Sequence, residues 1–405
     1  MVVFGGAVAL RSRSKTTSTT ASTIGTSSSG SLGLRSGLAF REFLLFRFTP
    51  ALYQARRAAR EANLQPGVVG ASPHHYTFES SMNTASLTDW TSPRPSSAPP
   101  RLALGTMNFG KRTAEGDARR IIAAAEEHGI TLLDTANVYN DGESERVVGR
   151  AIAKRRQAFL VASKVGLARR GRDAEGLDRA RVVAACEESL SRLGTDTIDI
   201  YYLHAPDHRT PIEDTLEGVA TLLKAGKIRS WAVSNYASWQ ILEMFQLCER
   251  SGLAKPVMSQ VIYNLLIRQL EYEYFKFTSK YRLHSTVYNP LAGGLLSGKY
   301  RPGSKWEAGG RFDANTMYQR RYWTERLLEG VETYEKLAAP MDLVTLAYAW
   351  VAGRAGVDSI LIGPGSLAHL EAAVRGCKEV LSPETRKRID EAHYAYVGSD
   401  ATYAR

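Results

Sequence analysis

The sequence predicts an α/β fold, a (β/α)8 TIM barrel behind a disordered N-terminal extension. Between about Arg101 and Gly376, short apolar runs alternate with segments of helical spacing, the pattern of parallel strands joined by crossover helices. Titratable side chains lie at or just after the ends of three of these runs. A closed parallel barrel brings such strand ends to one mouth, where (β/α)8 enzymes keep their chemistry. We therefore expect an enzyme.

The elements can be placed in order along the chain. The first strand closes at Gly105-Thr106-Met107, Ala118 to Glu127 has helical spacing, and Gly129 ends that helix. The later runs are short, mostly apolar and bounded by Gly or polar residues, as strands covered on both faces require. Further strands are expected at 130–134, 159–164, 198–204, 228–234, 257–263, 283–289 and 359–363, and helices at about 143–154, 179–193, 213–225, 237–251, 341–353 and 367–377.

An open doubly wound sheet is the alternative fold. Its Gly-rich fingerprint after the first strand is missing, because Gly105-Thr106-Met107-Asn108-Phe109-Gly110 does not match GxGxxG. Eight strands of this kind favour the closed barrel.

The N-terminal part differs in composition from the rest. Residues 1–95 hold ten Lys or Arg against four Asp or Glu, with Ser/Thr clusters such as 16–20 and 27–29 and no convincing periodicity. Such a segment buries too little apolar surface to offset its ordering entropy. We expect a disordered extension over 1–97 and one barrel domain over 98–405.

Two origins fit that extension. Its Arg- and Ser-rich, acid-poor composition is typical of an organelle transit peptide, and a translation start nearer Met82 is the alternative. Arg41, Glu42 and Arg47 interrupt the apolar stretch from Leu38 to Leu52, so no transmembrane span of ~20 residues is expected. We expect a cytoplasmic protein, with organelle import as the other possibility.

Charge and cysteine content exclude several function classes. The extension accounts for +6 of the net charge of +11, and the remaining +5 is too small to predict a nucleic-acid partner. Cys186, Cys248 and Cys377 show no metal-ligand spacing, which indicates thiols in a reducing compartment. His204 and His208 flank Asp207, but no second ligand cluster accompanies them, and no metal site is expected.

Five blocks in order resemble the aldo-keto reductases. They are 133–139 (LDTANVY), 162–164 (ASK), 202–207 (YLHAPD), 233–236 (VSNY) and 288–300 (YNPLAGGLLSGKY). The likeness covers nearly all of residues 101–376 and looks closest to the aflatoxin-aldehyde and succinic-semialdehyde reductase branch. It implies a TIM barrel that reduces small aldehydes or ketones with a nicotinamide cofactor.

The four titratable residues fit carbonyl reduction. The reaction needs a proton on the carbonyl oxygen. A free tyrosine, with a pKa of about 10, is too weak an acid to release and recover its proton readily near neutral pH. Tyr139 is the expected donor, Lys164 would stabilise its phenolate, and Asp134 would fix Lys164. His204 would hydrogen-bond the carbonyl oxygen. Taken singly, each of the four also has a purely structural interpretation. Asp134 would cap a helix and Tyr139 would lie in a surface loop. Lys164 would be an ordinary strand-end lysine, and His204 a strand-end histidine whose hydrogen bonds are satisfied.

The cofactor is expected at the same mouth. The loop from Pro290 to Lys299, with Leu291 and Gly293, can bring backbone N–H groups to a pyrophosphate, and the turn at Gly363 opens a helix whose N-terminus favours an anion. By resemblance, the nicotinamide carboxamide would bind Ser234, Asn235 and Gln260, and the nicotinamide ring would stack on Tyr288. The adenosine phosphate would lie near Ser366 and His369. Tyr288 can alternatively be barrel wall, and the glycines a tight turn.

One departure bears on the choice of cofactor. In the related branch, the last helix begins with the polar pair Ser-Ser and carries an Asn further along. This chain has Gly365-Ser366 and Ala373 at these places, and no Lys or Arg lies between Gly363 and Ala373. A 2′-phosphate would have fewer partners here. NADPH is expected from the resemblance, and NADH stays open.

Substrate residues are expected from two regions. The insertion between the last two strands can pair a carboxylate and pack an apolar chain through Arg311, Arg320, Arg321, Tyr318, Tyr322 and Trp323. Alternatively, these arginines form a solvated face or contact cofactor phosphates. The apolar wall of the substrate pocket is expected to include Met107, Phe109, Trp231 and Tyr236. Alternatively, these side chains pack inside the barrel.

Two other functions deserve comparison. Potassium-channel beta subunits resemble the same family and act as cofactor-bound partners of a channel; the Asn289–Gly294 segment favours the reductases instead. A barrel isomerase or hydrolase would bind no nicotinamide. We expect a monomer or homodimer that acts on small molecules, with no membrane partner.

Overall fold

The computed structural model describes residues 86–95, 97–167, 174–313 and 315–398. The chain divides into two units, 1–77 and 78–405, and every described residue belongs to the second. The expected disordered extension therefore falls mostly outside the described residues.

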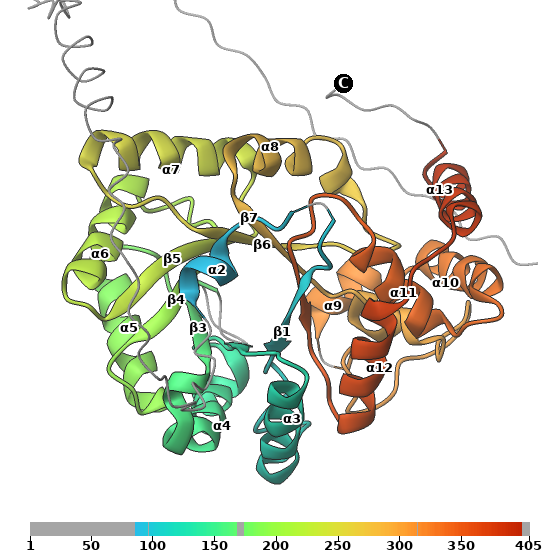
Figure 1. Ribbon diagram of the computed structural model, residues 1–405, viewed down its shortest axis with the longest axis horizontal. Helices are drawn as coiled ribbons and strands as arrows, with labels where there is room; N and C mark the ends of the chain where they lie inside the picture. The colour runs from blue at the N-terminus through green and yellow to red at the C-terminus, as the bar shows by residue number, and fades with distance from the viewer. Residues whose placement is uncertain (1–85, 96, 168–173, 314, 399–405) are drawn as a thin grey trace, which may run out of the picture. The chain divides into compact units, whose positions relative to one another are not determined.

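Eight parallel strands close into a barrel in sequential order, which confirms the expected fold (Figure 1). The closure is a direct pairing of the first and last strands, with Leu102 opposite Ile360. The strands are β1 (Arg101–Gly105), β2 (Leu132–Asp134), β3 (Leu160–Val165), β4 (Ile198–Leu203), β5 (Ile228–Ser234), β6 (Met258–Ile262), β7 (His284–Tyr288) and β8 (Ser359–Ile362).

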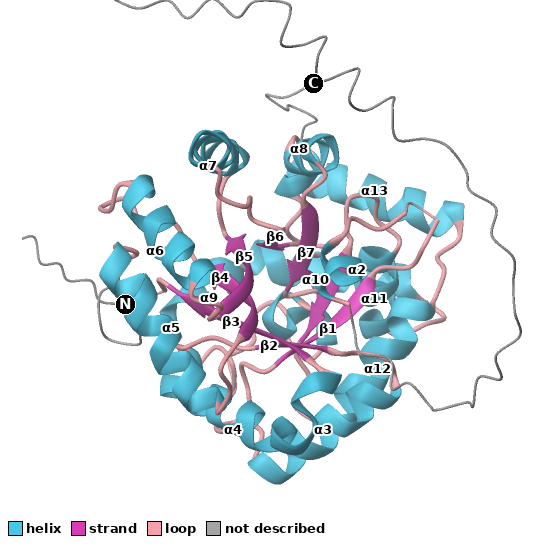
Figure 2. Ribbon diagram, turned by 60° about the vertical axis from the view of Figure 1, so that its left-hand side comes forward, coloured by secondary structure: helices cyan, strands magenta, loops and turns pink. Residues whose placement is uncertain are grey.

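The helices surround the strands, as Figure 2 shows. Those anticipated from the sequence are α3 (Glu115–Glu127), α4 (Glu143–Ile152), α5 (Arg179–Leu193), α6 (Ile212–Lys224), α7 (Ser238–Ser251), α11 (Leu343–Ala352) and α12 (Leu367–Lys378). The sequence reasoning missed α2 (Leu87–Thr91), α8 (Tyr274–Tyr281), α9 (Thr316–Tyr322), α10 (Glu325–Ala338) and α13 (Pro383–Val397). Of these, α9 and α10 lie inside the insertion between β7 and β8.

Strand alternation divides the core into two layers. Outward side chains pack under the helices in one large cluster. A smaller cluster fills the barrel interior with Trp90, Ala103, Leu132, Leu160, Ala162, Ile200, Tyr202, Ala232 and Met258.

The N-terminal boundary expected at residue 98 is too late, because residues 86–95 pack on the barrel. The Trp90 side chain is 7% exposed and joins the interior cluster, with its ring centre 5.6 Å from that of His284. The Arg94 backbone N–H donates to Asp358 Oδ1 at 2.8 Å. His284 begins β7 and Asp358 precedes β8, so this segment covers the end of the barrel where the strands begin.

Three further observations concern the described residues. No helix among them is both long and apolar enough to cross a bilayer. No cluster of His, Cys, Asp and Glu among them could hold a metal ion. Cys186 and Cys248 are buried and Cys377 is half-buried; all three are free thiols on helices.

Candidate active site

The four expected catalytic residues meet at the mouth formed by the strand ends. Asp134 ends β2, Lys164 lies near the end of β3, and His204 follows β4. Tyr139 begins a short 3-10 helix (η1, Tyr139–Gly142) directly after β2. The Lys164 ammonium lies 5.1 Å from the centre of the Tyr139 ring, and the rings of Tyr139 and His204 are 5.9 Å apart.

A buried ion pair forms the base of this site. Lys164 Nζ donates to Asp134 Oδ1 and to the Thr135 carbonyl, the latter at 2.7 Å. Gln260 Nε2 donates to Asp134 Oδ2 at 2.9 Å, so both carboxylate oxygens have partners. The side chains of Lys164 and Asp134 are 0% and 1% exposed. Charges at this depth are stable only when paired and hydrogen-bonded, as they are here.

Burial sets the protonation states around the pair. Loss of water raises the pKa of Tyr139 well above its usual value, and the Asp134 carboxylate adds to this; Arg311 opposes it. Burial lowers the pKa of Lys164, which Asp134 partly restores. Burial, followed by the charge of Lys164, lowers the pKa of His204. At neutral pH Tyr139 therefore keeps its proton, and His204 is a neutral ring.

A left-handed turn holds Tyr139 at the mouth. Asn140 has φ of 51°, a conformation that Asn tolerates better than most residues. Its side-chain amide donates to the carbonyls of Met107 and Phe109 at 3.0 and 2.7 Å. The loop after β1 is thereby fastened to the turn that carries the tyrosine.

Four residues expected at the nicotinamide lie together across β5, β6 and β7. Ser234 Oγ donates to the Gln260 carbonyl at 2.8 Å, and Asn235 Nδ2 donates to the His204 carbonyl at 2.8 Å. The Tyr288 hydroxyl donates to Asn235 Oδ1 at 2.6 Å. These amide and hydroxyl groups adjoin the catalytic four and match the donor and acceptor chemistry of a carboxamide.

The loop after β7 supplies the second expected group. Pro290 is buried, Leu291 and Gly293 are half-buried, and Gly293 and Gly294 have φ of 68° and 107°. The space beside the Gly294 Cα is open, so a ligand can approach the backbone there. Lys299 is exposed and pairs with Glu307 at 2.8 Å. A surface pair of this kind is weak, so the ammonium can turn to an anion.

The turn after β8 supplies the third group. Ser366 caps α12 by accepting from the His369 N–H at 3.3 Å, and His369 Nδ1 accepts from the Gly365 N–H at 3.3 Å. Gly363 is exposed with open space beside it. This helix start offers the polarity that suits a phosphate.

Arginines from outside residues 363–373 add positive charge on this side of the mouth. Arg311 donates to Asn108 Oδ1 at 3.0 Å, and Asn108 Nδ2 reaches the Gly363 carbonyl at 3.4 Å. Arg112 is close enough for Arg311 to lower its pKa, after the larger effect of burial. The insertion after β7 thus links the Arg311 guanidinium to the turn through Asn108. Arg112, on the loop after β1, lies near Arg311 and donates to the Gly310 carbonyl at 3.1 Å. Contact with cofactor phosphates is one of the roles that the sequence leaves open for Arg311, whereas nothing in the sequence pattern points to Arg112.

Comparison with known proteins decides the family. The model of the Aldo/keto reductase family matches residues 101–393. The chain belongs to the aldo/keto reductase family. It is an oxidoreductase that depends on a nicotinamide cofactor, as the resemblance implied.

Two curated relatives and one solved structure illustrate the likeness. Aflatoxin B1 aldehyde reductase member 2 from Homo sapiens is 34% identical, over 76% of this chain and 90% of that protein. A probable voltage-gated potassium channel subunit beta from Oryza sativa is 31% identical, over 70% of this chain and 89% of that protein. The glycerol dehydrogenase AKR11B4 from Gluconobacter oxydans superposes with a TM-score of 0.63 at 28% identity, covering 78% of this chain and 98% of that one.

The structure places two of the expected substrate residues elsewhere in this aldo/keto reductase. Trp231 points outward into the helical layer, where its indole N–H donates to the Ala254 carbonyl at 2.7 Å, because the neighbouring Ala232 takes the inward position. Phe109 is fully buried in the same layer. Neither faces the mouth.

Of the other expected substrate residues, Met107, Tyr236 and Arg321 lie near the mouth. Met107 is half-buried beside the Tyr139 turn, and Tyr236 is buried, with its hydroxyl donating to the Ala205 carbonyl at 3.2 Å. On α9, Arg321 is half-buried and lies close enough to Tyr288 to oppose the rise in that residue's pKa caused by burial, whereas Arg320 is exposed.

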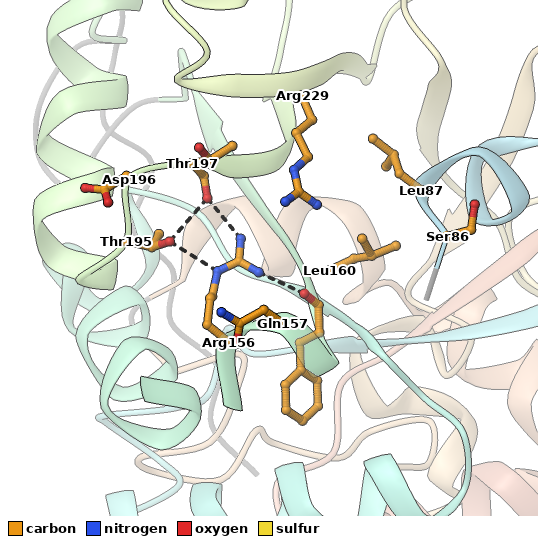
Figure 3. Close-up of a pocket in the computed structure, with 10 residues that line it drawn as sticks. Ser86, Leu87, Arg156, Gln157, Leu160, Thr195, Asp196, Thr197 and Arg229 are labelled. Atoms are coloured by element: carbon orange, nitrogen blue, oxygen red, sulfur yellow. Dashed lines mark hydrogen bonds between the residues drawn. The ribbon is translucent and has the colours of Figure 1, made fainter. Parts of the chain in front are cut away.

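A cavity of about 530 Å³ opens at the other end of the barrel, where β3, β4 and β5 begin. Figure 3 shows Arg156 there, hydrogen-bonded to Thr195 and Thr197, with Arg229 reaching toward the same place. Both guanidinium groups pair with the buried Asp199 at 2.7 Å. Because these charges already satisfy each other, we assign this cavity no part in the chemistry.

Proposed function

We propose that this aldo/keto reductase reduces small aldehydes or ketones to alcohols with NADPH, and that Tyr139 donates the proton. The observation behind the proposal is the convergence of Tyr139, Lys164, Asp134 and His204 within one mouth. A bound nicotinamide would supply the hydride; the chain's own residues handle the proton.

The roles follow from the contacts. Tyr139 is protonated at neutral pH and can donate its hydroxyl proton to a carbonyl oxygen. The Lys164 cation beside the ring would stabilise the phenolate left behind, and Asp134 keeps Lys164 in place. Neutral His204, facing the Tyr139 ring, can orient the same carbonyl oxygen by a hydrogen bond.

The cofactor would lie across three groups of residues. Its carboxamide would meet Ser234, Asn235 and Gln260, with Tyr288 against the ring. The loop Pro290–Lys299 and the turn 363–366 would hold the phosphates, helped by His369. Arg311 supplies positive charge near that turn through Asn108, and Arg112 lies near Arg311; both support NADPH despite the lack of basic residues in 363–373.

Fluorescence titration with NADPH and NADH tests this assignment. We expect NADPH to bind at least tenfold more tightly, with Arg112→Met reducing that ratio. Equal affinities would support NADH use, and binding of neither would overturn the proposal.

Arg321 gives a basis for substrate choice. It sits half-buried by Tyr288, where a guanidinium can pair a substrate carboxylate. Arg321→Met should lower kcat/KM for a carboxylated aldehyde by about tenfold. An uncharged aldehyde of equal length should be unaffected, and exposed Arg320→Met is the matched control. Equal losses on both substrates would exclude carboxylate pairing.

A channel-associated role is the second candidate, favoured by the likeness to the rice beta subunit. Pull-down with channel-containing membranes, run beside a turnover assay, separates the two. We propose a monomer or homodimer in the cytoplasm, or in an organelle reached through residues 1–85; sedimentation and cell fractionation would test both points.

A further inference from the structure

A buried carboxylate that the proposed mechanism does not use lies in the helix directly after the proton donor. Glu145 is in the first turn of α4, which follows the Tyr139 turn η1, and its side chain is 0% exposed. Its Oε1 accepts from Ser163 Oγ, and its Oε2 accepts from Arg192 Nε at 2.6 Å. Burying a carboxylate this deeply costs stability unless it is paired and hydrogen-bonded. Glu145 has both kinds of partner, and each belongs to a different element.

Ser163 connects this carboxylate to the strand that carries Lys164. Side chains alternate along β3, with Val161 in the layer under the helices and Ala162 in the barrel interior. Ser163 therefore points outward to α4, while its neighbour Lys164 points inward to the mouth. One hydrogen bond thus ties the helix behind the Tyr139 turn to the strand position next to Lys164.

Arg192 connects the carboxylate to the turn itself. It lies in the last turn of α5, where its Nη2 donates to Ser189 Oγ at 3.2 Å and its Nη1 lies 3.6 Å from Glu188 Oε2. Gly142, the last residue of η1, has φ of 84°, and a Cβ there would lie 2.6 Å from Arg192 Cδ and 2.8 Å from its Nε. Because glycine has no side chain, Arg192 can pass directly against the turn on its way to Glu145.

We propose that Glu145, held by Ser163 and Arg192, is a positioning residue that fixes the Tyr139 turn to β3 and so sets the place of the proton donor relative to Lys164. The inference rests on the function proposed above. Glu145 meets its two partners in the layer between β3 and the helices, so its role is to place the proton donor and not to react.

The turn η1 needs such support because its backbone is strained. Asn140 and Asp141 have φ of 51° and 55°, and left-handed conformations of this kind persist only where the surrounding structure determines them. Asn140 fastens the turn to the loop after β1, and Glu145 fastens the helix that continues from the turn to β3. A displacement of about 1 Å in a reacting group can lower a rate roughly 100-fold, so a small shift of Tyr139 would matter.

The charge of Glu145 also acts on Lys164 and must be kept constant in a test of placement. Burial lowers the pKa of Lys164, Asp134 raises it, and Glu145 adds a smaller rise. Arg192 remains the partner of Glu145 when Ser163 is replaced, so this charge stays in place. A Ser163 substitution therefore changes the attachment of the turn alone.

Two buried strand serines give a matched experiment. Ser163→Ala removes the hydrogen bond to Glu145. Ser230→Ala removes the bond from Ser230 Oγ to the Asp199 carbonyl at 2.8 Å, near the start of β5 and so at the other end of the barrel. Each variant loses one buried side-chain hydrogen bond, so the melting temperature measures the purely structural loss in both.

We expect Ser163→Ala to lower kcat by about tenfold with KM and NADPH affinity unchanged, because the donor shifts while the residues expected to bind the cofactor do not. Ser230→Ala should keep the wild-type kcat. Equal kcat values for the two variants would overturn the proposal. If Ser163→Ala does not fold, Ser163→Cys keeps nearly the same shape with a much weaker donor, and it must show the same fall in kcat at constant KM.

A second readout does not depend on turnover. In protein labelled with 3-fluorotyrosine, the ¹⁹F resonance of Tyr139 is identified by its loss in Tyr139→Phe. Its chemical shift should change by more than its linewidth in Ser163→Ala and stay fixed in Ser230→Ala, since the ring moves relative to the Lys164 charge only in the first. A changed shift in a protein that reduces no carbonyl would support the positioning role and refute the proposed function. An unchanged shift would overturn the positioning role alone.

Discussion

The Lys164 ammonium faces the ring of Tyr139 at 5.1 Å, while its hydrogen bonds go to Asp134 and the Thr135 carbonyl. The lysine thus acts on the tyrosine through its charge and not through a direct bond to the phenol. Burial raises the pKa of Tyr139, the Asp134 carboxylate raises it further, and the residue keeps its proton at neutral pH.

Removing the Tyr139 hydroxyl should abolish the proton donor without disturbing the pocket. Tyr139→Phe keeps the ring, so we expect turnover of a test aldehyde to fall by about two to four decades with NADPH affinity little changed. Stopped-flow turnover and fluorescence titration measure the two quantities. Activity near that of the wild type would refute the assignment.

Lys164 and Asp134 should behave as one unit. Lys164→Met removes the cation that stabilises the phenolate, so the rate should fall and the basic limb of the pH–rate profile should move upward. Asp134→Asn should give a smaller effect, and the double variant should lose less than the sum of the two, because each residue acts through the other. Additive losses, measured with kcat/KM in a double-mutant cycle, would show independent roles.

The two hydrogen bonds from the Asn140 side chain to the loop after β1 should affect turnover more than cofactor binding. Asn140→Ala removes both bonds to the loop after β1 and leaves a strained φ of 51°. We expect kcat to fall by about tenfold as Tyr139 loses its fixed position. Asp141→Asn, at the neighbouring left-handed residue, is the control and should retain wild-type kcat.

The N-terminal segment should decide how short the chain can be made. A chain beginning at Met82 should fold and reduce aldehydes with kinetic constants close to those of the full-length protein, because it keeps residues 86–95. A chain beginning at Ala98 should melt at a distinctly lower temperature, since it loses the buried Trp90; Trp90→Ala alone should cost about 3–5 kcal/mol. Equal melting temperatures for the two shortened chains would show that the segment adds no stability.

His284 should make stability depend on acid. Its folded pKa of about 3 lies below the usual value near 6.5, so the unfolded chain binds more protons between these values. The contribution is full above about pH 6.5 and is lost as pH falls toward 3, roughly 2 kcal/mol of it by pH 5. Urea unfolding at pH 7.5 and 5 should show a smaller change for His284→Gln than for the wild type. An identical change in both would contradict this.

The strand and helix pattern determined much of this protein by itself. Parallel strands buried on both faces leave short apolar runs, and the residue at each run's end must lie at one mouth once the barrel closes. That local rule is why Asp134, Lys164 and His204 could be placed together from the sequence. The expectation for Ser234 and Tyr288 came from the resemblance to the aldo-keto reductases and not from this rule.

Only the tertiary structure decided the remaining features, because they depend on contacts between distant segments. Trp231 could have faced either side until the pairing register gave the inward position to Ala232. Trp90 lies in a segment whose composition indicates disorder, yet its side chain packs into the barrel interior. Arg311 reaches Gly363 through Asn108, and Gln260 on β6 reaches Asp134 on β2 across the barrel. No spacing along the chain encodes such links, since they arise where the curvature of a closed sheet brings inward and loop positions together.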